Sequence, residues 1–138
     1  MTFPKPVRFP ALVPLVALTA LLGSGGVAAQ IDFTQEQADS GKATYRESCQ
    51  ICHGSSLMNG QFGTPLRGKS FRDKWTGKSL GELQQFVYEK MPPDNLKSLT
   101  PEQVAALVAY IFSRNDLPPT TTPLPADSVS QMAVPLPF

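Results

Sequence analysis

The sequence has few charged residues and few of the side chains that most often bind metals. Charged residues make up 17% of its 138 residues, and the formal net charge of +1 excludes a strongly basic nucleic-acid-binding protein. The chain contains one histidine and two cysteines, which are too few for a zinc site built mainly from these ligands. No catalytic triad, paired-carboxylate site or phosphate-binding loop is recognisable. These absences argue against an enzyme active site.

Proline is scarce in the middle of the chain and concentrated at its two ends. Four of the 14 prolines lie in the first 14 residues, and six lie in the last 21. Because proline-rich segments seldom build a packed core, the folded domain is expected at residues 30–117. Residues 118–138 are predicted to form a proline-rich disordered tail.

Residues 1–29 have the order of a secretory signal. Lys5 and Arg8 form a basic start, and the apolar run Ala11–Leu22 follows. Val27-Ala28-Ala29 then offers small residues to a signal peptidase. We expect cleavage after residue 29 and export to the bacterial periplasm, which leaves a formal charge of −1 and no membrane span. The alternative is an uncleaved membrane anchor, because the uncharged stretch 11–29 approaches the roughly 20 residues that span a bilayer.

Three segments combine a helix start signal with apolar residues at helical spacing. Each begins at a serine or threonine with Glu or Gln three residues later, the pattern of a capping box. The predicted helices span about residues 35–50, 79–91 and 100–114. Residues 54–78 indicate a loop with one short helical turn near 73–76, and no window shows the alternation of a strand. The expected class is all-α, with three main helices and long loops.

Both cysteines and the histidine fall within Cys49-Gln50-Ile51-Cys52-His53. Cys-x-x-Cys-His is the attachment sequence of c-type haem. Two thiols at this spacing can bond the two vinyl groups of one porphyrin, and the adjacent histidine then binds the iron. We therefore predict one haem c, attached covalently through Cys49 and Cys52. A bound group would also complete the core of a small domain that contains a long loop.

A redox-active dithiol and a structural disulfide are the alternatives at this motif. A thioredoxin-like Cys-x-x-Cys sits at a strand-to-helix turn, and no strand is expected before Cys49. A disulfide between cysteines separated by two residues closes a very small loop and stabilises the fold little. Both alternatives are therefore weaker than haem attachment.

The scarcity of histidine also limits the second iron ligand. His53 is the only histidine, so methionine is the next candidate. Met58 lies five residues beyond His53, and Met132 lies in the proline-rich tail. Met91 ends an amphipathic helix, precedes two prolines and lies 38 residues from His53, enough chain to reach the other face of the haem. We predict His53 and Met91 as axial ligands and Met58 as ordinary packing.

Over about residues 40–114 the chain resembles the small class I c-type cytochromes. The resemblance implies the cytochrome c fold, with helices and long loops wrapped around one covalently attached haem. The Leu80–Met91 segment and the region around Trp75 look most like the cytochrome domains that serve quinoprotein dehydrogenases. The matching residues are Gly41, Tyr45, Cys49, Cys52, His53, Gly54, Thr64-Pro65-Leu66-Arg67-Gly68, Met91-Pro92-Pro93 and Val104–Arg114.

The resemblance implies further roles around the haem. The Pro65 carbonyl would accept a hydrogen bond from Nδ1 of His53 and fix its orientation. Gly41 would lie where the first and last helices cross. Trp75 would contact a haem propionate through its indole N–H, with simple core burial as the alternative.

A basic cluster lies between the attachment site and the methionine. It is expected to neutralise the propionates, with Arg67 as a cofactor-binding residue, and to form a docking patch near the haem edge. The alternative is an ordinary solvated loop. The cluster consists of Arg67, Lys69, Arg72, Lys74 and Lys78, opposed only by Asp73.

These features together predict a single-electron carrier that is not an enzyme. An iron with two protein ligands has no open coordination site for a substrate. The expected partners are redox proteins, a dehydrogenase or an oxidase, with a quinoprotein dehydrogenase suggested by the resemblance. One alternative is a cytochrome subunit held permanently in such a complex, with residues 118–138 as its docking segment. Another is a haem enzyme or gas sensor with a labile methionine ligand.

Overall fold

The computed structural model describes residues 1–2 and 30–138. The predicted export signal lies almost wholly on residues 3–29, outside the described part of the chain. Among the described residues, no helix is long and apolar enough to cross a membrane. The helices are, in chain order, α1 (Gln35–Ser48), α2 (Gln50–His53), α3 (Lys69–Trp75), α4 (Leu80–Lys90) and α5 (Pro101–Arg114).

The all-α prediction is confirmed, since the only β pairing in residues 1–2 and 30–138 is one isolated bridge between Ser79 and Pro135. The three predicted main helices correspond to α1, α4 and α5. All three capping boxes form: each N-cap hydroxyl accepts a hydrogen bond from the backbone N–H three residues on, and the Glu or Gln side chain there accepts one from the N-cap backbone N–H. Local hydrogen bonding within each capping box therefore marks where these helices begin.

Helix α3 lies within the segment 54–78 that was expected to be mainly a loop. It spans Lys69–Trp75, longer and earlier than the turn predicted at residues 73–76. Phe71 and Trp75 are four residues apart and therefore share one face, where both are buried with ring centroids 6.4 Å apart. The basic residues around them hid this short apolar face in the sequence.

Helices α1 and α5 cross at the centre of the core, which confirms the position expected for Gly41. A Cβ at Gly41 would overlap the carbonyl group of Ala106 in α5. The rings of Tyr45 and Tyr110 pack at the same crossing with centroids 5.4 Å apart. The absence of a side chain at Gly41 therefore permits the close approach of the two helices.

We expect Gly41→Ala to destabilise the protein by about 1–3 kcal/mol, the usual effect of overpacking a core. In an isolated helix the same change would stabilise the helix by about 1 kcal/mol. A destabilising effect would therefore show that the added methyl group is crowded at the α1–α5 crossing. Urea denaturation followed by circular dichroism measures it. Ser40→Ala, at an exposed position of the same helix, is the control and should change stability by less than about 0.5 kcal/mol. A Gly41→Ala protein as stable as the wild type would contradict this packing.

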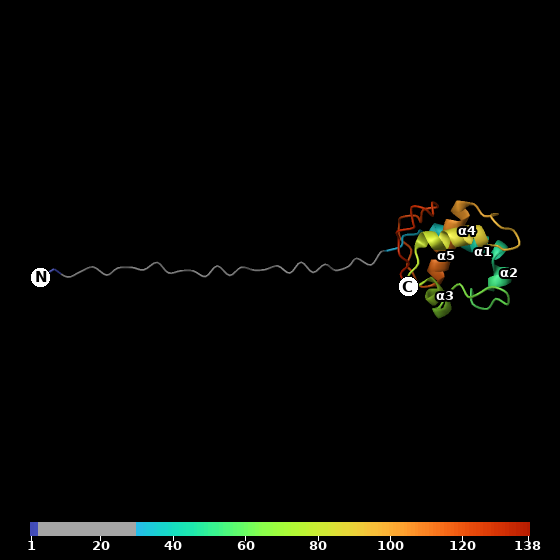
Figure 1. Ribbon diagram of the computed structural model, residues 1–138, viewed down its shortest axis with the longest axis horizontal. Helices are drawn as coiled ribbons and strands as arrows, with labels where there is room; N and C mark the ends of the chain where they lie inside the picture. Colours follow the sequence, from blue (N-terminus) through green and yellow to red (C-terminus); the bar gives the residue numbers. More distant parts are fainter. Residues whose placement is uncertain (3–29) are drawn as a thin grey trace.

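Residues 118–138 are ordered, so the prediction of a disordered tail and of a domain ending at residue 117 is wrong. We call this segment the C-terminal strap. Figure 1 shows it along the end of the domain where α4 begins, with the C-terminus close to α3. Leu124 and Leu136 are buried, and Phe138 packs on the core. The prolines prevent regular structure, but the apolar residues between them bury enough surface to fix the path of the chain.

Candidate cofactor site

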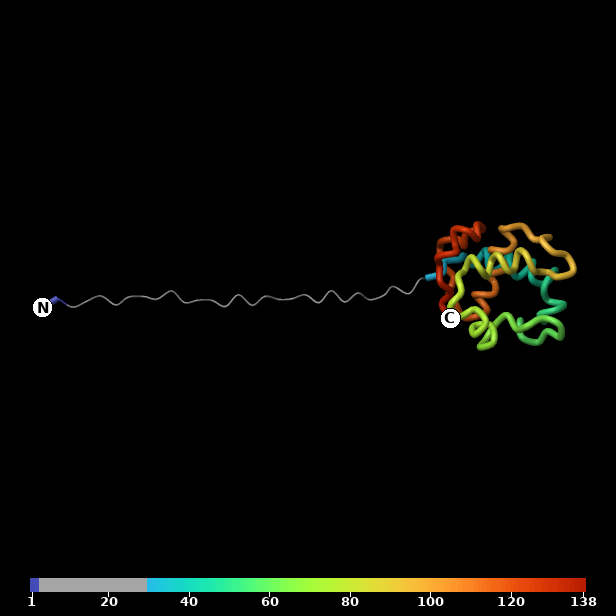
Figure 2. Tube along the Cα trace, in the orientation of Figure 1, coloured from blue at the N-terminus to red at the C-terminus, as the bar shows by residue number. Residues whose placement is uncertain are grey.

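A largely apolar cavity lies between the Cys-x-x-Cys-His segment and helices α3, α4 and α5. Figure 2 shows α2, the loop 54–68 and the segment 91–100 together at the end of the domain opposite the C-terminal strap. Helices α3, α4 and α5 contribute seven apolar side chains to the cavity wall. These are Phe71 and Trp75 from α3, Leu83, Phe86 and Val87 from α4, and Leu107 and Ile111 from α5.

The structure brings both thiols and the imidazole to this cavity. Cys49 and Cys52 are free, half-buried thiols, and both line the cavity together with His53. His53 is buried, and its Nδ1–H donates to the carbonyl oxygen of Thr64 at 2.8 Å. Because this hydrogen bond occupies Nδ1, Nε2 is the nitrogen left to bind a metal.

The hydrogen-bond acceptor for His53 lies one residue earlier than predicted. The carbonyl of Thr64, not that of Pro65, receives the Nδ1–H, although Pro65 does line the cavity. The loop approaches the ring closely, and a Cβ at Gly63 would lie 2.5 Å from Nδ1. The path of this loop decides which carbonyl faces the imidazole, and sequence reasoning missed Gly63 and Thr64. The glycine at position 63, which has no side chain, was the only signal in the sequence.

The environment of Cys49 argues against the redox-active dithiol. Burial, and secondarily the neighbouring Cys52, raises the pKa of the Cys49 thiol from 9.0 to about 11. The thiol is therefore protonated at neutral pH. Redox-active Cys-x-x-Cys motifs instead lower the pKa of their nucleophilic cysteine, so that it is a thiolate when it reacts.

Met91 is the only one of the three candidate methionines that lines this cavity in the described part of the chain. It is the C-cap residue of α4 and is half-buried against the core. Met58 is 55% exposed, and Met132 lies in the C-terminal strap with its sulfur 3.9 Å from the Ser79 hydroxyl. The fold thus brings His53 and Met91 to one cavity, the arrangement that the predicted axial pair requires.

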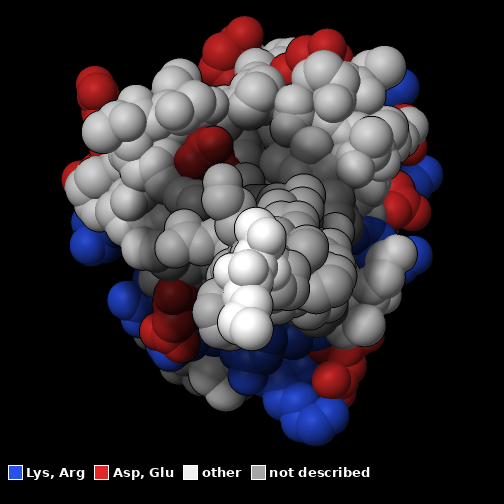
Figure 3. All heavy atoms as spheres, turned by 90° about the vertical axis from the view of Figure 1, so that its left-hand side faces the viewer, with Lys and Arg blue, Asp and Glu red and all other residues white. Residues whose placement is uncertain are grey.

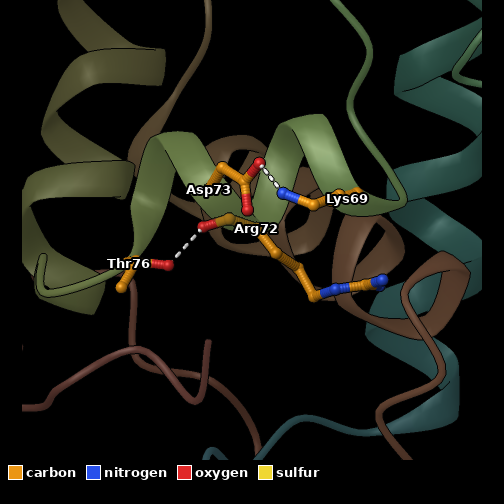
Figure 4. Close-up of polar contacts among 4 residues, drawn as sticks. All are labelled: Lys69, Arg72, Asp73 and Thr76. Carbon is orange, nitrogen blue, oxygen red and sulfur yellow. Dashed lines mark hydrogen bonds and ion pairs between the residues drawn. The ribbon is translucent and has the colours of Figure 1, made fainter.

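The predicted basic cluster divides into parts with different surroundings. On the exposed side of α3, Lys69 forms an ion pair with Asp73 at 2.6 Å (Figure 4). The Arg72 side chain points away from this pair, and its carbonyl accepts a hydrogen bond from Thr76 at 2.8 Å (Figure 4). Figure 3 shows several Lys and Arg side chains at the lower edge of this face, with Asp and Glu side chains spread around it, some of them next to the basic ones. A single docking patch is therefore too simple a description.

Lys74 turns from this cluster to the cavity. Its Nζ lies 4.8 Å from the ring centroid of Phe86 and 5.8 Å from that of Trp75, which is within cation–π range. Lys74 and Trp75 both line the cavity, whereas Arg67 does not. Trp75 is also buried and packs edge-on against Phe86 with centroids 5.6 Å apart, so it is both a core residue and a wall residue.

The residues at this cavity fit a covalently attached haem. Two thiols, an imidazole with a free Nε2 and a thioether converge on an apolar space. Among the described residues, no three His, Cys, Asp or Glu side chains come together in a way that could hold a metal ion. The donor set therefore suits a metal that arrives within a macrocycle, and it does not suit a metal held by protein ligands alone.

Comparisons with known proteins agree with this chemistry. Residues 36–111 match the family model described as cytochrome C oxidase, cbb3-type, subunit III. One curated relative, the 1-butanol dehydrogenase (cytochrome c) of Thauera butanivorans, is 32% identical over 91 residues. The aligned part covers 62% of this chain but only 12% of that relative. No solved structure matches the chain significantly.

Proposed function

Because this chain belongs to the c-type cytochrome family that the cbb3-type subunit III model describes, we propose that it is a single-electron carrier. We propose one haem c, attached through Cys49 and Cys52, with His53 and Met91 as axial ligands. When bound, this group supplies reversible one-electron chemistry at its iron. The observation that carries the proposal is the convergence of the two thiols, the free Nε2 of His53 and Met91 on one apolar cavity.

The side chains of the cavity would tune this chemistry and would catalyse no reaction of their own. The Thr64 carbonyl orients the His53 ring and increases the basicity of Nε2 through the Nδ1 hydrogen bond. The apolar wall excludes water and disfavours the additional positive charge of the oxidised state, which raises the reduction potential. Two protein ligands leave no open position for a substrate, which supports electron transfer.

The optical spectrum of the holoprotein tests the proposal. We expect the bands of reduced haem c, a near-infrared sulfur-to-iron band in the oxidised form, and one haem per chain by mass. Rapid binding of carbon monoxide to the native reduced protein at neutral pH would contradict two tight protein ligands. It would favour the haem enzyme or gas sensor.

We propose that Lys74, in place of Arg67, neutralises a haem propionate, with Trp75 beside it. Lys74→Gln should lower the reduction potential by roughly 20–70 mV, because loss of a partly screened positive charge favours the oxidised state by about 0.5–1.5 kcal/mol. Potentiometric titration measures the shift. Lys69→Gln is the control and should shift the potential by much less, since Lys69 is highly exposed and paired with Asp73. Equal shifts in the two variants would contradict the assignment.

A dehydrogenase is the partner that we propose as electron donor, outside the cytoplasm. The support is the similarity to a segment of 1-butanol dehydrogenase (cytochrome c), together with the signal-like pattern of residues 1–29. A second candidate function is that of a subunit held permanently in such a complex, since the similar segment in that relative is part of a longer protein. Co-purification from the native source at moderate salt separates a bound subunit from a free carrier.

A further inference from the structure

The N–H groups in the first turn of α4 donate to two kinds of acceptor, the Ser79 hydroxyl and backbone carbonyls of the C-terminal strap. A helix begins with four N–H groups that have no partner within the helix. Ser79 caps one of them through its hydroxyl. The Leu80 N–H donates to the Val134 carbonyl at 2.8 Å. The Gly81 N–H donates to the Gln131 carbonyl at 3.1 Å. The C-terminal strap therefore completes a cap that the capping box leaves unfinished.

The end of the strap also packs against the buried face of α3. The Leu136 N–H donates to the Lys78 carbonyl, just after α3, at 2.9 Å. The ring of Phe138 packs edge-on against Phe71 with centroids 5.6 Å apart, and it also packs against Phe112 at 6.2 Å. Phe71 in turn lines the cofactor cavity. The end of the strap is thus an outer layer behind that part of the cavity wall.

Two glutamine side chains hold the middle of the strap. Gln37 of α1 makes a reciprocal pair with Leu124: its Nε2 donates to the carbonyl at 2.9 Å, and its Oε1 accepts from the N–H at 2.7 Å. Gln84 of α4 donates from Nε2 to the Pro125 carbonyl at 2.7 Å. The Oε1 of Gln84 is buried and finds no donor within the described residues, which costs free energy. The strap is therefore hydrogen-bonded directly to α4, the helix that precedes Met91.

From these contacts we infer that the C-terminal strap positions Met91. The strap fixes the first turn of α4, and Met91 follows the last residue of that helix as its C-cap. Since α4 is a short, continuous helix, release of its first turn from the strap lets the whole helix shift against α5. The inference rests on the proposed ligation by His53 and Met91. It gives the strap a role within the domain, in place of docking to a partner.

Gly81→Ala tests this inference because the atoms nearest to the added Cβ all belong to the C-terminal strap. A Cβ at Gly81 would overlap the Ser128 carbonyl and lie 2.8 Å from the Met132 nitrogen, both in the strap backbone. Within α4 itself, alanine is the better helix former. In the oxidised holoprotein we expect the near-infrared band to disappear at least about 10 °C below global unfolding. Hydrogen exchange at the Leu80 amide should accelerate at least tenfold.

The matched control is Gly41→Ala, which also forces a Cβ against backbone but at the α1–α5 crossing, away from the strap. In this variant the near-infrared band and the helical signal should be lost together, at one lowered temperature. If Gly81→Ala keeps the band up to its unfolding temperature, the strap does not position Met91. A wild-type holoprotein without the band would instead refute the proposed ligation, and with it this inference.

Discussion

Replacement of both Cys49 and Cys52 with alanine is expected to give a chain without covalent haem and with roughly half or less of the native helical signal. In a domain of this size the buried core is small, and much of the apolar surface of α3, α4 and α5 faces the cavity. The cavity exists only in the folded state, so a group that fills it stabilises the folded state relative to the unfolded chain. Haem staining after denaturing electrophoresis and far-ultraviolet circular dichroism measure the two effects.

Each single variant, Cys49→Ala or Cys52→Ala, serves as a control for the double variant. Either should retain one thioether bond and therefore covalent haem, in a protein less stable than the wild type. A double variant that keeps native-like helicity without haem would show that the protein core is sufficient by itself. The proposed structural role of the cofactor would then be wrong.

Met91→Ala is expected to lower the reduction potential by the order of 0.1 V or more, within the ≈ 0.8 V range over which axial ligands set haem potentials. The neutral thioether of methionine favours the reduced state relative to stronger donors, and its loss removes this preference. The near-infrared band should disappear as well. Potentiometric titration and the oxidised spectrum are the two measurements.

Met58→Leu is the matched control, because Met58 is exposed and does not line the cavity. This variant should retain both the potential and the near-infrared band. If Met58→Leu loses the band while Met91→Ala keeps it, Met58 is the ligand and the proposed site is wrong.

The features that the sequence determined are those whose chemistry is contained in a few neighbouring residues. Cys49, Cys52 and His53 carry the attachment pattern within five positions, and no distant residue is needed to interpret it. The starts of α1, α4 and α5 depend on hydrogen bonds between residues three apart, so each capping box was predictable. Local hydrogen bonding and local covalent geometry were sufficient in these cases.

The sequence could not predict which backbone carbonyl of the loop accepts the hydrogen bond from His53. Both Thr64 and Pro65 have a carbonyl that could face His53, and only the folded path of the loop chooses Thr64. The choice depends on how closely Gly63 approaches the ring. Likewise, nothing local shows that Lys74, alone in its basic cluster, turns towards the rings of Phe86 and Trp75.

The C-terminal strap shows the same limit on a larger scale. Its high proline content disfavours regular structure, but composition says nothing about the contacts that an irregular segment makes. Gln37 and Leu124, which pair through two hydrogen bonds, are 87 residues apart in the chain. Only the tertiary structure decided that the tail is ordered, because the partners that order it are brought together by the packing of α1 and α4 on α5.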